Sequence, residues 1–177
     1  MFRDWENFYI LMGGSAGALI GLLFVVVTLT GEMKLERERA LRAADHYMTP
    51  TVVMFCTVLV TGALATAPRL PAAVQGALLG LIAVGGVAYG VWLFLAIRSR
   101  MEPTQHWSDP WFYGVAPGAC FALLALSDAL ALADLRLVAY GVALSIVAML
   151  LTGIRNAWDL ITWMASGRRS EAQPQNE

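Results

Sequence analysis

Five long apolar stretches alternate with short polar segments along the chain. Each stretch is close to the roughly 20 residues that a helix needs to cross the hydrocarbon core of a bilayer. A soluble core has no use for several such stretches in succession. The pattern predicts an all-α fold, a polytopic membrane helix bundle of about five transmembrane helices. The expected spans are residues 8–30, 49–67, 71–97, 111–133 and 137–154.

Prolines mark several of the expected helix ends. Thr49–Pro50 and Asp109–Pro110 each place a capping side chain before a proline at the first helical position. Pro68 ends the second span. Pro117 lies about two turns inside the fourth span, where it removes a backbone hydrogen bond, so a kink is expected there.

The polar segments are expected to differ in structure. Residues 31–48 are the most charged and predict an amphipathic helix at the membrane surface, or an extension of the first span. The fifth helix is expected to continue along the interface, where Arg155 and Asp159 are spaced for an ion pair. Residues 167–177 predict a disordered polar tail, which leaves residues 1–166 as a single transmembrane domain.

The basic residues are distributed unevenly between the two sides that five spans define. Cytoplasmic loops carry an excess of Lys and Arg. Nine of the 12 basic residues fall on one side, which predicts an outside N-terminus and an inside C-terminus. These nine are Lys34, Arg37, Arg39, Arg42, Arg98, Arg100, Arg155, Arg168 and Arg169.

Composition agrees with the hydropathy pattern. Apolar residues make up 58% of the chain and charged residues 14%, against about 25% charged in ordinary globular chains. The expected environment is the lipid bilayer, and the net charge of −1 gives no indication of a nucleic-acid partner. Cys56 and Cys120 lie inside apolar stretches, where free cysteine behaves as a small hydrophobic residue.

The segment GGSAG at residues 13–17 fits the G-x-S-x-G pattern of serine hydrolases. A nucleophilic serine needs a base within hydrogen-bond reach, and the pattern needs a strand–turn–helix context. Ser15 lies within an apolar helix instead, and both histidines, His46 and His106, fall in segments on the opposite side of the membrane. No catalytic residue is therefore assigned, and the chain is not expected to be an enzyme.

The glycines instead predict close helix packing. Residues four apart share one face of a helix, and a face of small residues lets another helix approach closely in lipid. The G-x-x-x-G spacing recurs in three of the predicted spans, and Gly14 and Ala18 line an adjacent stripe. Whether the partners lie in the same chain or in another copy stays open. The packing glycines are Gly13, Gly17, Gly21, Gly76, Gly80, Gly86, Gly90, Gly114 and Gly118.

Ionisable residues at membrane depth are candidates for function, and few are present. Asp128 lies either one turn inside the fourth span or at a helix end near the surface, with Arg3 or Arg136 as partner, and we favour the second position. A speculative polar site at the inner interface consists of Asp45, His46, His106 and Asp109. Their spacing matches no metal-ligand motif, so solvated loop residues are the alternative, and no metal or cofactor is expected.

The first part of the chain also carries a resemblance. The segments WENFYILMGGSAGALIGLLFVVVTLTGE and TPTVVMFC resemble an uncharacterised group of small bacterial integral membrane proteins. These open with a similar W-E-N-F-Y segment followed by a span rich in Gly, Ser and Ala. The resemblance covers about the first 65 residues. It implies a multi-pass protein of the bacterial inner membrane and carries no catalytic role.

Three functions are compatible with these features. The first is a non-enzymatic assembly or accessory subunit that packs through small-residue helix faces, as a homo-oligomer or with another membrane protein. The second is a small oligomeric channel or transporter that uses Asp128, Pro117 and the threonines of the second span. The third is a membrane enzyme or cofactor protein that uses the polar site at the inner interface.

Overall fold

The computed structural model describes residues 2–31, 49–99, 110–130 and 135–171, and all regular structure within these ranges is helical. Five helical segments are long and apolar enough to cross a membrane, which confirms the predicted all-α bundle of five spans. A short 3-10 turn, η1, precedes the first span. The elements are η1 Arg3–Trp5, α1 Glu6–Gly31, α3 Thr49–Thr66, α4 Ala72–Ser99, the π-helix η3 Pro110–Val115, α5 Ala116–Ala129 and α6 Leu135–Glu171.

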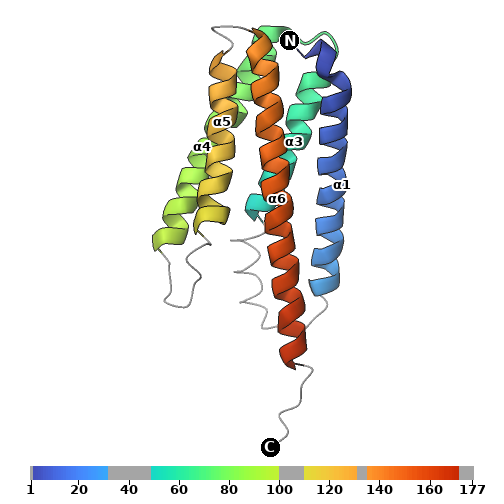
Figure 1. Cartoon of the computed structure of the whole chain (residues 1–177), viewed down its shortest axis with the longest axis vertical. Helices are drawn as coiled ribbons and strands as arrows, with labels where there is room; N and C mark the ends of the chain where they lie inside the picture. The colour runs from blue at the N-terminus through green and yellow to red at the C-terminus, as the bar shows by residue number, and fades with distance from the viewer. Residues whose placement is uncertain (1, 32–48, 100–109, 131–134, 172–177) are drawn as a thin grey trace, which may run out of the picture.

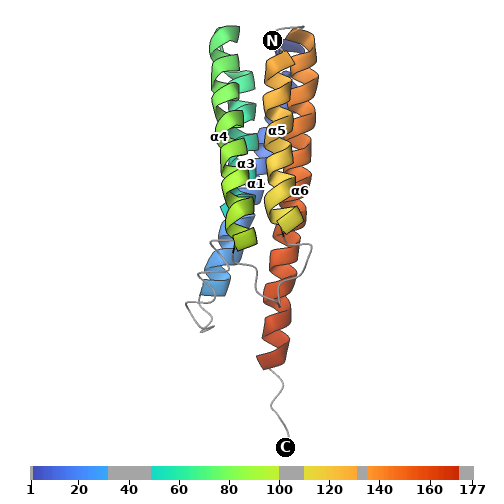
Figure 2. The same ribbon diagram turned by 90° about the vertical axis from the view of Figure 1, so that its left-hand side faces the viewer.

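The helices run up and down and contact one another in an order that differs from the sequence. α1 packs on α3, α3 on α6, α6 on α5, and α5 on α4 (Figures 1 and 2). α3 and α4 are joined by the short segment 67–71, yet they share few contacts, because they diverge from this turn. We call the end that holds residue 2 and this turn the N-terminal end, and the opposite end the C-terminal end.

α6 is the central and longest helix, with 37 residues. It packs against both α3 and α5. At the C-terminal end of the bundle it extends past the ends of the neighbouring helices (Figure 1). Residues 167–171 are helical, although the sequence assigned them to the polar tail. The fourth span ends at Ala129, one turn before the predicted residue 133.

Two pairs of glycines set the closest approaches between helix backbones. Gly13 of α1 meets Gly62 of α3, where a Cβ on Gly62 would lie 2.8 Å from the carbonyl oxygen of Tyr9. Gly90 of α4 meets Gly118 of α5, where a Cβ on Gly90 would lie 2.8 Å from the Cα of its partner. Real side chains do not tolerate such distances from backbone atoms, so these crossings require glycine.

Other glycines lie mainly against side chains. The Phe121 ring lies against Gly86, and both the backbone Cα and the side chain of Phe94 in α4 lie against Gly114 of η3. Gly17 makes only an ordinary contact, at 3.8 Å, with a methyl group of Leu59. Gly76 and Gly80 face the carboxyl group of Asp128, which is described below. Most of the glycines predicted to pack therefore lie against residues of the same chain.

Three glycines have no such neighbour. A Cβ built on Gly14, Gly21 or Gly85 meets no atom within 4 Å. Gly21 therefore does not share the packed face of Gly13 and Gly17. Gly14 and Gly21 lie instead on the outward side of α1, together with the exposed Ala18.

An aromatic cluster fixes the start of α1 against the start of α6. Trp5 meets Phe8 and Tyr140 edge to face, with ring centroids 5.5 and 4.8 Å away. The buried Tyr9 hydroxyl donates to the carbonyl of Ala139 at 3.0 Å. The aromatic residues of the W-E-N-F-Y segment thus have a packing role, because they attach the peripheral α1 to the central helix.

Glycine substitutions can test these crossings. We expect Gly62→Ala and Gly90→Ala to lower the free energy of unfolding by about 1–3 kcal/mol each, because the added methyl group overpacks a backbone contact. Gly85→Ala is the matched control and should be neutral or slightly stabilising, because alanine favours helix. Equilibrium unfolding in mixed micelles measures the difference. Equal effects at all three positions would contradict the assignment.

Candidate functional site

The first turn of the fourth span is the π-helix η3, which passes into α5 next to Pro117. In a π-helix each carbonyl accepts a hydrogen bond from the N–H five residues later. For Phe112 that residue is Pro117, which has no N–H. The sequence predicted a kink at this proline, and the structure has a π-helical turn just before it. In that register the Phe112 carbonyl lacks a backbone donor.

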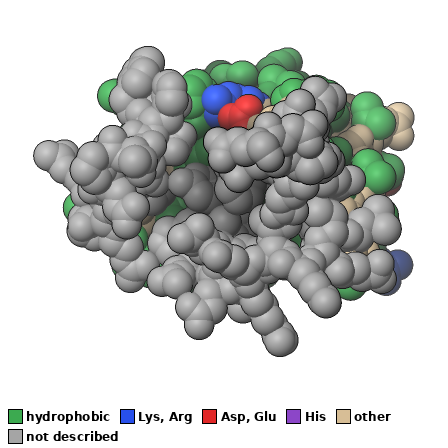
Figure 3. All heavy atoms as spheres, turned by 90° about the horizontal axis from the view of Figure 1, so that it is seen from below, with side chains coloured by type: hydrophobic (Ala, Val, Ile, Leu, Met, Phe, Trp, Pro, Cys, Tyr) green, Lys and Arg blue, Asp and Glu red, His purple; other side chains and the backbone are tan. Residues whose placement is uncertain are grey.

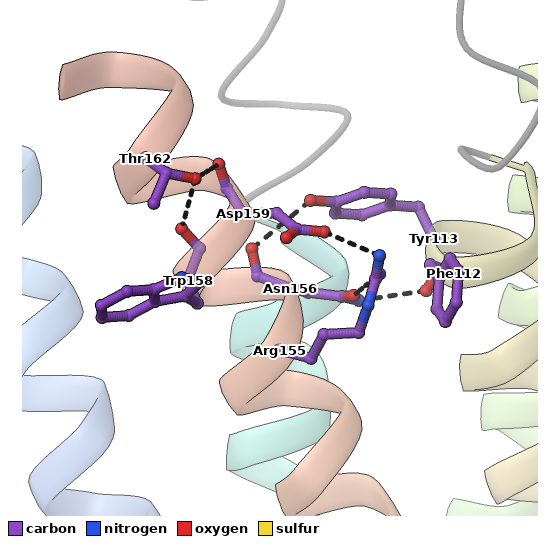
Figure 4. A network of polar contacts seen from close by, with 7 residues as sticks. All are labelled: Phe112, Tyr113, Arg155, Asn156, Trp158, Asp159 and Thr162. Carbon is purple, nitrogen blue, oxygen red and sulfur yellow. Dashed lines mark hydrogen bonds and ion pairs between the residues drawn. The ribbon is translucent and has the colours of Figure 1, made fainter. Parts of the chain in front are cut away.

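Asn156 of α6 supplies a donor instead. Its side chain is fully buried, and its Nδ2 donates to the Phe112 carbonyl at 3.0 Å (Figure 4). Its Oδ1 accepts from Nη1 of Arg155 at 3.3 Å, and its backbone carbonyl accepts from the Tyr113 hydroxyl at 3.4 Å. The amide is thus used at both ends. An unpaired carbonyl in hydrocarbon would cost several kcal/mol, so Asn156 repairs a defect that proline creates.

Arg155 completes the network on the side of α6 that faces η3. Its guanidinium lies 3.2 Å above the centre of the Phe112 ring, and it forms the predicted ion pair with Asp159 at 2.9 Å. A view from the C-terminal end shows a basic and an acidic group side by side among hydrophobic side chains (Figure 3). Both side chains of the ion pair are about 40% exposed, so the pair itself contributes little stability.

The chemistry of this network is structural. The Arg155 guanidinium contacts the Asp159 carboxylate, the side-chain oxygen of Asn156 and the Phe112 ring. The Asn156 amide nitrogen donates to the Phe112 carbonyl. Thr162 donates to carbonyls of its own helix, at 3.0 Å to Trp158 and 2.9 Å to Asp159. The contacts of Arg155 and Asn156 with Phe112 and Tyr113 hold η3 against α6.

A second amide repairs a second proline defect near the N-terminal end. The carbonyl of Leu64 in α3 would bond the N–H of residue 68 in a continuous helix, and that residue is Pro68. The buried Gln75 of α4 donates its Nε2 to this carbonyl at 2.9 Å. The backbone N–H of Ala67 also donates to this oxygen, at the longer distance of 3.4 Å. Gln75 therefore ties the end of α3 to the start of α4.

Asp128 lies in the last turn of α5 and faces α4. A Cβ built on Gly80 would lie 2.8 Å from its Oδ2, and one on Gly76 would lie 3.6 Å from its Oδ1. Oδ1 is buried and has no hydrogen-bond partner. Asp128 thus belongs to the helix rather than to a cap beyond it, because the helix ends at Ala129. The side chains of Arg3 and Arg136 lie outside the described residues.

Hydroxyl groups in the bundle mostly bond to their own helices. Thr57 and Thr61 of the second span are 8% and 0% exposed, so both lie in the core. The Thr61 hydroxyl oxygen is buried with no partner. Four other Ser and Thr hydroxyls donate to carbonyls four residues earlier, from Thr57 to Val53, Ser127 to Leu123, Ser145 to Gly141 and Thr152 to Ala148, at 2.6–2.8 Å.

The speculative site at the inner interface cannot be placed. Asp45, His46, His106 and Asp109 all lie outside the described residues. Ser15 is half-buried on α1. Among the residues that the structure describes, no three His, Cys, Asp or Glu side chains gather in a group that could hold a metal ion.

The fold defines the class of the protein. Five apolar helices with buried polar side chains between them make it a multi-pass helical membrane protein. No family model, no curated protein and no solved structure matches the chain.

Sequence reasoning missed Gln75 and Asn156. Each is an isolated amide near the end of an apolar span, and that signal is present in the sequence. The sequence did not indicate which backbone carbonyl each amide bonds, because 44 residues separate Asn156 from Phe112.

A double-mutant cycle tests the repair at Pro117. We expect Asn156→Leu to lower the free energy of unfolding by about 1–2 kcal/mol, because the Phe112 carbonyl loses its donor. In a Pro117→Ala background the same change should cost less, because the alanine introduced there has an N–H and an α-helical register becomes available. Unfolding in bicelles measures the coupling.

Asp159→Asn serves as the control for that cycle. It removes the exposed ion pair beside the same asparagine and should change stability by less than about 1 kcal/mol. An Asn156→Leu cost that is the same with and without Pro117 would show that the amide does not serve this carbonyl.

Proposed function

We propose that this chain is a multi-pass protein of the bacterial inner membrane that acts by helix association, as an assembly or accessory subunit, and catalyses no reaction. The observation that carries the proposal is the outward face of α1. Gly14, Ala18 and Gly21 lie on this face, are exposed, and the two glycines have no neighbour within 4 Å. A face of small residues lets a second helix approach closely, and such packing drives association in lipid.

The position of α1 in the bundle supports this proposal. Only 17% of its membrane window is buried inside the chain, against 44% for α3 and α6. Its contacts are mainly with α3 and the start of α6. The large side chains Leu11, Leu22 and Phe24 of the same helix are 61%, 61% and 70% exposed, so α1 presents both small and large residues outward.

The partner that we propose is a second copy of this chain. Homo-oligomers with a two-fold axis use the same patch on both subunits. A stripe of small residues is suited to this arrangement, because two identical stripes can cross with their backbones close together.

Substitution of this face tests the proposal. We expect native mass spectrometry from mild detergent to show a defined oligomer for the unmodified chain and mainly monomer for Gly14→Leu and Gly21→Leu, because leucine keeps the helices apart. Gly85→Leu is the matched control. This glycine is also open, but it lies on α4 between the bulky exposed Leu81 and Trp92, and its variant should stay oligomeric. A monomeric unmodified chain, or oligomeric α1 variants, would refute the proposal.

One observation favours a second candidate, a small channel or transporter. Asp128 is a carboxyl group within a membrane-spanning window, and such groups commonly line ion or substrate pathways. Ion flux in proteoliposomes that disappears in Asp128→Asn would support this candidate over a purely associative role.

A further inference from the structure

The contact surface between α4 and α5, called the seam below, involves different groups at its two ends. Towards the C-terminal end the two backbones touch at Gly90 and Gly118, and the Phe121 ring lies against Gly86. Towards the N-terminal end the glycines of α4 face a carboxyl group instead. Asp128 directs both oxygens at this surface, Oδ2 towards Gly80 and Oδ1 towards Gly76.

The two glycines form a notch that the carboxyl group fills. With a side chain at Gly80, the Cβ would lie 2.8 Å from Oδ2, so the carboxyl group would have to move. Gly85, one and a half turns further along α4, has nothing within 4 Å. Of these α4 glycines, Gly76 and Gly80 thus meet the carboxyl group of α5, whereas Gly85 meets no neighbouring atom.

No described residue forms an ion pair with the carboxyl group in this notch. Oδ1 is buried without a hydrogen-bond partner, although the Asp128 side chain as a whole is half-buried. Arg69, in the turn before α4, is exposed. Between residues 72 and 96 of α4, and between residues 137 and 154 of α6, the sequence contains no charged residue. The other titratable groups in these two stretches and on α5 are Tyr89, Tyr140 and Cys120. The side chains of Asp134 and Arg136 lie outside the described residues.

The neighbouring polar groups are already engaged. The Gln75 amide donates to Leu64, and the Ser127 hydroxyl donates to Leu123. Burial of one oxygen without a partner disfavours the charged form of the carboxyl group. A metal cation is not the natural remedy, because Ca²⁺ and Mg²⁺ take about six or more oxygen ligands, and no acidic, histidine or cysteine cluster surrounds this carboxyl group in the described residues. A proton removes the charge without further ligands.

We propose that the notch between Asp128, Gly76 and Gly80 is a proton-binding site within the membrane. The neutral acid fits against the glycines of α4 and keeps the N-terminal half of the seam closed. Loss of the proton places a charge on the buried oxygen, so the carboxyl group must leave the notch towards water and the two helices separate there. Proton occupancy thereby controls the packing of α4 on α5.

Infrared difference spectroscopy of the full chain in lipid nanodiscs tests the site. The unmodified protein minus Asp128→Asn should show the carbonyl stretching band of a protonated carboxylic acid at neutral pH, with a shift in D₂O. The band should disappear as the pH is raised. Asp159→Asn removes an exposed carboxyl group and should leave the band unchanged. A difference spectrum at neutral pH that lacks this band would overturn the proposal.

Two glycine variants test the notch itself. Gly80→Ala should displace the carboxyl group and shift or abolish the band, whereas Gly85→Ala, on the same helix but in open space, should leave it unchanged. Identical spectra for the two variants would show that the notch does not hold the proton.

A hydrophobic carbodiimide gives an independent readout, because it modifies protonated carboxyl groups in apolar surroundings. Peptide mass mapping should find the adduct on Asp128, with a yield that falls as the pH rises and that is lost in Asp128→Asn. Modification of Asp4 and Glu6 without modification of Asp128 would count against a proton at this site. These experiments do not depend on oligomeric state, so they can fail or succeed separately from the proposed helix association.

Discussion

The constraint on which this structure depends is that a backbone carbonyl inside a bilayer must be hydrogen-bonded within the protein. A continuous helix meets it without help, but proline does not. The chain places one proline after α3 and another at the start of α5, and each leaves a carbonyl without its usual donor. In both places a side-chain amide from a neighbouring helix, Gln75 or Asn156, donates to that carbonyl. Each of these hydrogen bonds links two helical segments, one pair near each end of the bundle.

Glycine is the second means by which the helices are held together, and it acts in three different ways. At Gly62 and Gly90 it permits contact between backbones. At Gly80 it makes room for a carboxyl group, and at Gly14 it faces open space on the most peripheral helix. The same residue type therefore supports internal packing, a polar notch and a face suited to a partner. Both proposals concern glycines that do not contact a neighbouring backbone.

Sequence reasoning predicted the features that are local. The five spans follow from hydropathy, and the ion pair of Arg155 with Asp159 follows from an i,i+4 spacing on one helix. It did not predict what occupies each glycine face. Gly76 and Gly80 were interpreted as a helix-packing stripe, but the nearest group is the carboxyl of Asp128, which lies on a different helix much later in the chain. Such pairings depend on the order in which helices meet, and hydropathy carries no information about that order.

The class of the protein, the number of its spans and the positions of its prolines could be predicted from sequence, because apolar length and the missing N–H of proline are properties of single segments. The packing of the helices was needed to show that α3 and α4, neighbours in sequence, diverge, and that α6 lies between α3 and α5. It was also needed to show that Asn156 reaches Phe112 and that Asp128 reaches Gly80. Helices in lipid have similar apolar surfaces, so close contacts and hydrogen bonds between specific residues select the arrangement, and those contacts exist only once the helices are assembled.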